Sequence, residues 1–254
     1  MTFAKYPSLA GRVVFVTGGA SGIGADIVRA FADNGSKVAF VDINDTDGEA
    51  LVAELAGAEH QPVFMHCDLT EVSVLQATIE EVGRTLGPIA VLVNNAANDD
   101  RKPIDEVDVE YWDNSQAINL RPQFFAAQAV AKQMKALGYG SIINFSSIAW
   151  RGGAANMTPY ATAKAAVNGL TRALARGLGN DNIRVNAIEP GAVMTPRQRK
   201  LWYPEDSQVE AMVGHQLIKR VLLGEEIART VLFLAADDSR MITKQSIRVD
   251  AGMS

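Results

Sequence analysis

Strand-length apolar segments alternate with helix-length amphipathic segments along the whole chain. This alternation is typical of a parallel sheet with helices packed on both of its faces. The apolar segments predict strands at 12–17, 37–42, 62–66, 89–93, 141–146, 183–188 and 245–249, and the amphipathic segments predict helices near 22–34, 46–56, 71–85, 104–114, 116–137, 159–178 and 224–236. The pattern therefore predicts an α/β fold of the Rossmann-type, doubly wound kind, with a seven-stranded parallel sheet.

No repeat, low-complexity tract or linker interrupts this order, so residues 1–254 are predicted to form a single domain. The segment 190–224 differs from the rest, because it mixes Arg and Lys with Trp202 and Tyr203 and joins two core elements. Long connections of this kind are often functional, and we expect a substrate-binding lid there.

Composition narrows the class of protein. With 48% hydrophobic and 21% charged residues, the chain can bury a large core. Its longest apolar runs, such as Ile89–Val93, fall far short of the roughly 18 residues that a bilayer span needs. No membrane association is expected, and the absence of a long apolar leader favours a cytoplasmic protein. A net charge of −5 also argues against nucleic acid as a partner.

Cysteine and histidine usage bears on metals and disulfides. Cys67 is the one cysteine, which excludes an internal disulfide, and the three histidines are scattered along the chain. We therefore expect no metal site.

A glycine-rich turn follows the first predicted strand and runs directly into a helix. The turn places Gly18, Gly22 and Gly24 around Ser21 and Ile23. Backbone amides at the start of a helix lack internal partners and can bind a phosphate, while glycine allows its close approach. Glycine also occurs in such turns for geometry alone.

Asp42 strengthens the reading of this turn as a dinucleotide site. It ends the second predicted strand, where a carboxylate accepts hydrogen bonds from an adenosine ribose and repels a 2′-phosphate. Neither Ser21 nor Ile43 offers a basic group for such a phosphate, so NAD is favoured over NADP as the cofactor.

Tyr160 and Lys164 lie four residues apart on a predicted helix, so their side chains project from the same face. A nearby ammonium group favours the phenolate and is expected to lower the pKa of the tyrosine. Ser147 follows the strand at 141–146 and places a hydroxyl at the carboxyl edge of the sheet, where it can stabilise a developing alkoxide.

These features, together with further motifs in the same order, resemble the short-chain dehydrogenase/reductase family over essentially the whole chain. The motifs are TGGASGIG, CDLT, NNAAN, AINL, Ser147, YATAK and EPGAVMT. The resemblance implies an oxidoreductase with Tyr160 as general acid or base, Lys164 and Ser147 as its partners, and Asn119 completing a proton relay. The cofactor contacts that it implies are Asp68, Leu69, Asn95, Ala96, Pro190, Gly191, Val193 and Thr195, besides the residues of the glycine turn, Asp42, Ile43, Tyr160 and Lys164. It also implies a homotetramer that assembles through the helices at 104–137 and 159–178 and the C-terminal strand.

Simpler interpretations exist for two of these residues: Asn119 could bond to backbone within a helix, and Thr195 could cap the next helix. The chain also departs from the family pattern at Ala97, Lys244 and Ala251, where the family commonly has glycine.

Finer features resemble bacterial aldose 1-dehydrogenases, which oxidise a sugar at its anomeric carbon. They are NNAANDDRKP, Tyr111-Trp112, NLRPQFF, INFSSIAW and the segment around 197–204. The side chains expected to contact this small-molecule substrate are Asn98, Ser147, Trp150, Asn156, Tyr160, Gln198 and Trp202. Alternatives are a dehydrogenase of polyols, hydroxy acids or 3-oxoacyl thioesters, and a catalytically silent NAD(H) sensor.

Overall fold

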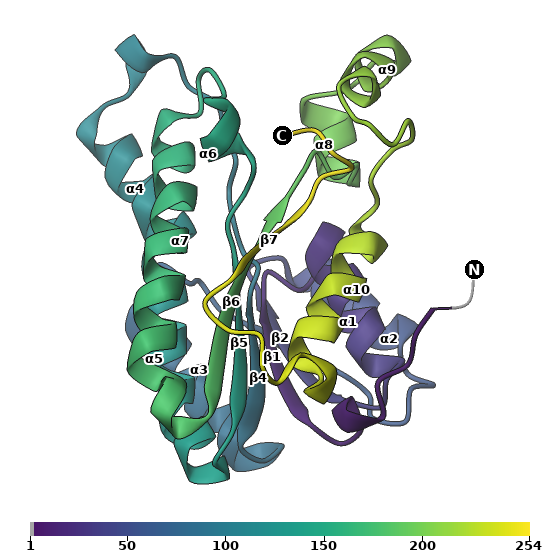
Figure 1. The fold of residues 1–254 in the computed structure, drawn as a ribbon, viewed down its shortest axis with the longest axis vertical. Helices are drawn as coiled ribbons and strands as arrows, with labels where there is room; N and C mark the ends of the chain where they lie inside the picture. Colours follow the sequence, from purple (N-terminus) through teal and green to yellow (C-terminus); the bar gives the residue numbers. More distant parts are fainter. Residues whose placement is uncertain (1–2) are drawn as a thin grey trace.

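The computed structural model describes residues 3–254, so residues 1–2 of the expected domain lie outside it, and the remainder is organised around one sheet (Figure 1). Seven parallel strands follow the order β3-β2-β1-β4-β5-β6-β7, which reverses direction between β1 and β4. They are β1 (Val13–Thr17), β2 (Lys37–Asp42), β3 (Val63–His66), β4 (Ile89–Asn94), β5 (Gly140–Phe145), β6 (Ile183–Pro190) and β7 (Ser246–Val249). The predicted Rossmann-type fold is confirmed.

Helices cover both faces of the sheet. They are α1 (Gly22–Ala32), α2 (Asp45–Glu54), α3 (Val72–Thr85), α4 (Val109–Asn119), α5 (Arg121–Leu137), α6 (Ala149–Gly152), α7 (Thr158–Leu178), α8 (Pro196–Leu201), α9 (Asp206–Gly214) and α10 (Gly224–Ala235). Helices α1 and α10 share one buried cluster, while α3, α5 and α7 lie against the other face (Figure 1).

Strand β1 shows why its sequence is apolar throughout. Val14 and Val16 belong to the cluster under α1 and α10, whereas Val13 and Phe15 belong to the cluster under α3 and α5. Both faces of a strand in such a sheet are covered, so its residues need not alternate between apolar and polar types.

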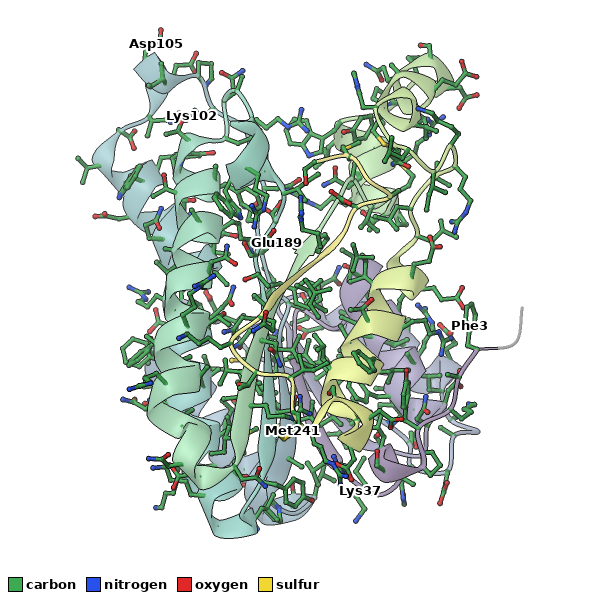
Figure 2. All side chains as sticks on the ribbon, viewed as in Figure 1. Phe3, Lys37, Lys102, Asp105, Glu189 and Met241 are labelled. Carbon is green, nitrogen blue, oxygen red and sulfur yellow. The ribbon has the colours of Figure 1, made fainter. Side chains whose placement is uncertain are left out.

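The amino ends and the carboxyl ends of the strands lie at opposite ends of the molecule. Lys37, at the start of β2, lies near one end, and Lys102, in the loop that follows β4, lies near the other (Figure 2). The glycine turn, the loop after β4 and Ser147 all follow the carboxyl ends of strands. The fold therefore gathers at one edge residues that are far apart in sequence.

The predicted boundary between the helices at 104–114 and 116–137 was wrong. A short 3-10 helix covers Ile104–Glu106, and α4 begins after Asp108, whose side chain accepts a hydrogen bond from the Tyr111 amide at 2.7 Å. The break falls at Leu120 because Pro122 lies in the first turn of α5, where its missing N–H is harmless.

The expected lid, 190–224, contains the short helices α8 and α9. Its two ends meet, because Val193 and Leu222 form a parallel bridge and the Met194 amide donates to the Leu222 oxygen at 2.9 Å. Among residues 3–254, no helix combines the length and the apolar character that crossing a bilayer requires.

Candidate active site

In the turn between β1 and α1 the glycine positions leave little room for side chains. Gly18 and Gly22 have φ angles of +65° and +53°, in the left-handed region that favours glycine. A Cβ at Gly24 would lie 1.8 Å from the Gly18 oxygen. Asn95, directly after β4, stabilises the turn, because its Nδ2 donates to the oxygens of Thr17 at 3.1 Å and Gly18 at 2.8 Å. Asn95, predicted as a cofactor contact, therefore also shapes the turn.

The start of α1 suits an anion. Ser21 is the N-cap residue, is exposed, and makes no capping hydrogen bond with its side chain. The first turn, which contains Ile23, carries no acidic residue to compete with a phosphate for the helix amides. A Cβ built on Gly22 would lie 3.2 Å from the methyl carbon of Thr195, so the lid approaches this turn directly. The turn fits a dinucleotide phosphate.

Asp42 lies beside the turn at the end of β2. Its Oδ2 accepts a hydrogen bond from the Ala20 amide at 3.1 Å, and its Oδ1 accepts one from the Ile43 amide at 2.8 Å. These bonds hold the carboxylate at the mouth of the turn. Further along the same edge, Asp68 is exposed after β3 and its Oδ1 accepts bonds from the Thr70 amide and hydroxyl, both at 2.8 Å, with Leu69 half-buried between them.

The lid begins with residues predicted to contact the nicotinamide. Pro190 ends β6, and the Gly191 amide donates to the Val249 oxygen at 2.9 Å. A Cβ on Gly191 would come within 2.7 Å of the Asp250 backbone, which explains the glycine. Val193 is buried, and Thr195 caps α8 by accepting a bond from the Gln198 amide at 3.2 Å. The capping interpretation of Thr195 therefore describes its side chain here. On the opposite side, Ala96 packs against Gly18.

Ser147, Tyr160 and Lys164 come together at the start of α7. The Nζ atom of Lys164 lies 5.5 Å from the centroid of the Tyr160 ring and donates to the Phe145 oxygen at 2.9 Å. The Ser147 hydroxyl accepts a bond from the Ala149 amide at 3.1 Å and is near enough to the phenol to lower its pKa. The predicted spacing thus brings an ammonium group, a phenol and a hydroxyl to one place.

The pKa of Tyr160 was expected to be lowered, but in the polypeptide without a cofactor it is raised. Burial raises the pKa of Tyr160 to about 12, and the charge of Asp99 adds to the rise, while Ser147 opposes it. Burial also lowers the pKa of Lys164 to about 7. Burial thus disfavours the ammonium form of Lys164 and weakens the cation that was expected to favour the phenolate.

The side chain of Asn119 bonds to backbone. It accepts from the Asn98 amide at 2.9 Å and donates to the oxygens of Asn98 and Ser115, both at 3.0 Å. Gln123, which the sequence did not single out, donates to the oxygens of Asn119 and Phe145, both at 3.2 Å. Gln123 thereby links Asn119 to the oxygen that holds Lys164. The sequence signal for Gln123 was its place in the segment NLRPQFF, which resembles the aldose 1-dehydrogenases.

The loop after β4 reaches across to the lid. Arg197 donates from its NH2 group to the side chains of Asn98 and Asp100, both at 3.0 Å, and Gln198 donates to Asp99 at 2.5 Å. The guanidinium of Arg101 lies 4.1 Å from the centroid of the Trp202 ring. Asn98, Gln198 and Trp202 were predicted, whereas Asp99 and Arg197 were missed.

Comparisons with known proteins settle the family. The sequence model of the family described as enoyl-(acyl carrier protein) reductase matches residues 18–254. D-xylose 1-dehydrogenase of Caulobacter vibrioides is 46% identical over 252 residues, which cover 99% of each protein. The probable galactose dehydrogenase of Rhizobium meliloti is 47% identical over 251 residues, 98% of each. The chain belongs to the short-chain dehydrogenase/reductase family. It is accordingly an oxidoreductase that acts on CH–OH groups.

Among solved structures, a blue fluorescent protein from a metagenomic library in complex with NADPH resembles this short-chain dehydrogenase. The TM-score is 0.89 at 35% identity, covering 97% of this chain and 99% of the other. The family membership and this likeness identify the cofactor as a nicotinamide nucleotide.

Trp150 and Asn156 were predicted to contact the substrate, but their contacts are with Glu189, Arg151 and the Lys102 amide. Trp150 donates from its indole to the Oε1 of Glu189 at 3.3 Å, and Arg151 covers its ring at 4.4 Å. Figure 2 shows Glu189 near the middle of the molecule. Asn156 is exposed, with a φ of +61°, and its oxygen accepts from the Lys102 amide at 2.7 Å. For Trp150 these contacts favour a packing role.

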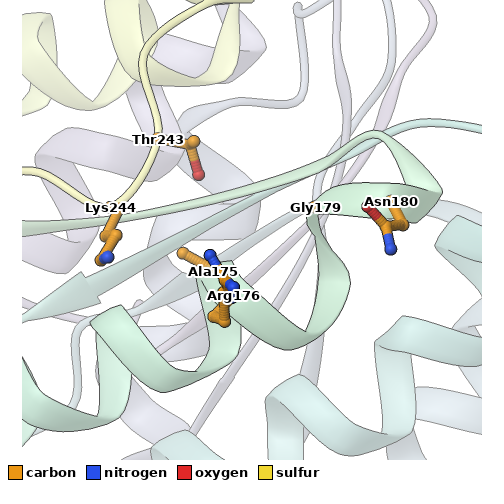
Figure 3. A pocket seen from close by; sticks show the side chains of 6 residues that line it. All are labelled: Ala175, Arg176, Gly179, Asn180, Thr243 and Lys244. Carbon is orange, nitrogen blue, oxygen red and sulfur yellow. The ribbon is translucent and has the colours of Figure 1, made fainter.

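Two hollows in the surface lie along α7 and β7. One, of about 340 Å³, is lined in part by Trp150, Arg172 and Ser246. The other, of about 460 Å³, lies near the C-terminal end of α7 (Figure 3). Its lining residues are Ala175, Arg176, Gly179, Asn180, Thr243 and Lys244. None of them belongs to the predicted catalytic or cofactor set.

Proposed function

We propose that this short-chain dehydrogenase oxidises an aldose at C1 to the aldonolactone, with NAD as the electron acceptor and Tyr160 as the general base. The observation that carries the proposal is the convergence of Ser147, Tyr160 and Lys164, together with the loop after β4, whose side chains hydrogen-bond to the lid. The two relatives named for xylose and galactose support the choice of an aldose, because they match this chain over nearly its full length.

The roles of the three side chains follow from their chemistry. The phenolate oxygen of Tyr160 removes the proton from the C1 hydroxyl, and the Ser147 hydroxyl donates a hydrogen bond to the same substrate oxygen as negative charge develops there. A bound nicotinamide cofactor would supply the acceptor for the hydride that leaves C1. Lys164, when protonated, favours the phenolate and so opposes the effect of burial on Tyr160. The lactone product opens with water to the aldonate.

The preference for NAD rests on Asp42. Its carboxylate is held beside the glycine turn by the Ala20 amide at 3.1 Å, where it would accept bonds from the two ribose hydroxyls of NAD. The same charge would repel the 2′-phosphate of NADP. Ile43 next to it is 66% exposed and supplies no positive charge.

The experiment that tests the proposal is a spectrophotometric panel with NAD and NADP. It pairs pentoses, hexoses, 6-deoxyhexoses and polyols with the parent enzyme and with Tyr160→Phe. We expect NAD-dependent oxidation of at least one aldose by the parent, its loss by more than about 1000-fold in the variant, and NADH binding unchanged within a few-fold. Activity on polyols but not on aldoses would reject the sugar. Turnover by Tyr160→Phe would reject the mechanism, and a parent inactive on every alcohol would favour a sensor.

We also propose a homotetramer. Helices α4 and α5 leave large apolar side chains partly uncovered, with Trp112 37% and Phe124 39% exposed, and a subunit interface would bury them. Light scattering of the purified enzyme tests this, since a mass near that of one chain would refute it.

A further inference from the structure

Asp99 joins the loop after β4 to the lid. Its Oδ2 accepts a hydrogen bond from the Nε2 of Gln198 at 2.5 Å, and its Oδ1 lies 3.4 Å from Arg197. The Asp99 side chain is 18% exposed, whereas that of Arg197 is 49% exposed. The Asp99 carboxylate is therefore more shielded from solvent than Arg197. One of its oxygens accepts its hydrogen bond from Gln198 of the lid.

The backbone around Asp99 is fixed in relation to the reacting groups. Asn98 is held through both its amide and its oxygen by the buried side chain of Asn119, at the end of α4. Three residues after Asp99, the Lys102 amide bonds to the Asn156 oxygen, just before α7 begins. The loop is thus anchored on the two helices whose ends carry Asn119 and Tyr160.

The charge of Asp99 acts on the reacting groups themselves. It raises the pKa of both Tyr160 and Lys164. The carboxylate is therefore coupled electrostatically to this pair, in agreement with the anchoring of its neighbour Asn98 on Asn119. Asp99 thus contacts helix α8 through Gln198 and Arg197, while the residue before it is held by Asn119.

We propose that Asp99 and Gln198 form a pair that determines substrate specificity by binding adjacent hydroxyl groups of a neutral sugar. The inference rests on the proposed aldose oxidation and names the side chains that select for it. A carboxylate accepts hydrogen bonds and an amide both donates and accepts them, so together they match a vicinal diol. Without a sugar they satisfy each other, and a diol can insert between them without leaving a polar group unpaired.

Such a pair also discriminates against compounds that lack the hydroxyls. A site that hydrogen-bonds a substrate hydroxyl rejects the analogue without it strongly, because its own polar groups then lose their partners. The lid can thus select polyhydroxylated substrates although the chemistry at Tyr160 would serve any secondary alcohol.

Asp100 provides a matched control. It is the next residue, carries the same charge and contacts the same Arg197 at 3.0 Å, but its side chain is 54% exposed. Its charge acts on Tyr111, whose pKa it helps to raise. Asp99→Asn and Asp100→Asn therefore remove equal charges from adjacent positions, one shielded and one exposed.

The test uses the purified enzyme with NAD and with D-xylose, D-galactose and their 2-, 3- and 4-deoxy forms. For Asp99→Asn we expect kcat/KM to fall about 30- to 100-fold with the parent sugar, which corresponds to about 2–3 kcal/mol of transition-state stabilisation. With the one deoxy sugar that lacks the hydroxyl bound by Asp99, the loss should be less than about threefold. Asp100→Asn should stay within about threefold of the parent on every sugar.

Three outcomes would overturn the inference. A change of less than threefold in Asp99→Asn shows that the carboxylate does not bind the substrate, and an equal loss on all the deoxy sugars shows a structural role. If Asp99→Asn fails to bind NADH, Gln198→Leu replaces it in the same series, and equal losses there have the same meaning. If the parent oxidises no aldose, the proposed function fails and this inference fails with it, whereas an active parent with an indifferent Asp99→Asn rejects only the inference.

Discussion

The Nζ atom of Lys164 and the main-chain oxygen of Phe145 are 2.9 Å apart, and the lysine is only 1% exposed. A neutral carbonyl oxygen is a modest partner for a buried ammonium group, which has lost most of its hydration. Burial therefore lowers the pKa of Lys164 to about 7. Below that pH the buried ammonium group of Lys164 lowers the free energy of unfolding.

The first prediction concerns stability and pH. In the unfolded chain Lys164 titrates near 10.4, so between about pH 7 and pH 10.5 the unfolded state binds more protons and this residue makes stability rise with pH. Lys164→Met removes the effect. At pH 7.5 the variant should have a higher free energy of unfolding than the parent. This difference should shrink by about 2–3 kcal/mol between pH 7.5 and 9.5. Urea unfolding of the cofactor-free protein measures this.

The exposed Lys132 on α5 supplies the control, because Lys132→Met should show no such pH dependence relative to the parent. A constant difference between Lys164→Met and the parent across this pH range would contradict the lowered pKa.

The second prediction concerns cofactor choice. Asp42→Asn removes the charge that would repel a 2′-phosphate and keeps an oxygen for the Ala20 amide. The ratio of kcat/KM for NADP to that for NAD should rise at least about tenfold, or about 1.4 kcal/mol. Initial rates with both cofactors measure it. Asp45→Asn changes a nearby exposed carboxylate that pairs with His66, and should leave the ratio within about twofold. A ratio unmoved by Asp42→Asn would refute the role of this residue.

The third prediction concerns two strained positions. Lys244 and Ala251 stand where the family commonly has glycine, and their φ angles are +64° and +55°. A side chain in this left-handed region costs roughly 1–2 kcal/mol, partly offset by the greater freedom of glycine in the unfolded chain. Lys244→Gly and Ala251→Gly should each stabilise the protein by about 0.5–1 kcal/mol in urea unfolding.

Ala173→Gly, at an exposed position within α7, should instead destabilise it by about 1 kcal/mol. Destabilisation by both glycine substitutions at 244 and 251 would show that their side chains matter more than their backbone strain.

The fourth prediction separates two roles for Trp150. Trp150→Phe removes the hydrogen bond to Glu189, a residue that is fully buried and otherwise bound by Arg151 at 2.6 Å. We expect a loss of about 1–2 kcal/mol in the free energy of unfolding, with kcat/KM for the sugar within about threefold. A tenfold or greater fall in kcat/KM at unchanged stability would instead place Trp150 against the substrate.

Much of the fold follows from local sequence pattern. Strand β2 (Lys37–Asp42) begins and ends where the pattern predicted it, because a strand covered on both faces is apolar throughout and stands out from its surroundings. The same holds for the glycine turn, since the positive φ angles at Gly18 and Gly22 leave few alternatives to glycine.

Other features depend on contacts that the local pattern does not encode. The break at Leu120 lies within a continuous helical pattern, and Pro122 alone does not say on which side of Asn119 the helix ends. Asp99 meets Gln198, 99 positions away, so its importance is visible only once the chain is folded. The pKa of Lys164 likewise depends on how deeply α7 buries it, which spacing alone does not fix.

The bridge between Val193 and Leu222 brings the two ends of the lid together, so the segment between them is an insertion that leaves and re-enters the fold at one place. Both residues are buried, at 4% and 5% exposure, so the chain leaves the core and rejoins it at adjoining points. Changes in the length of the chain between them therefore need not move β6 or α10, provided that Thr195 keeps its place beside Gly22. The side chains of this one stretch that face a substrate can thus vary while Ser147, Tyr160 and Lys164, which lie outside it, stay in place.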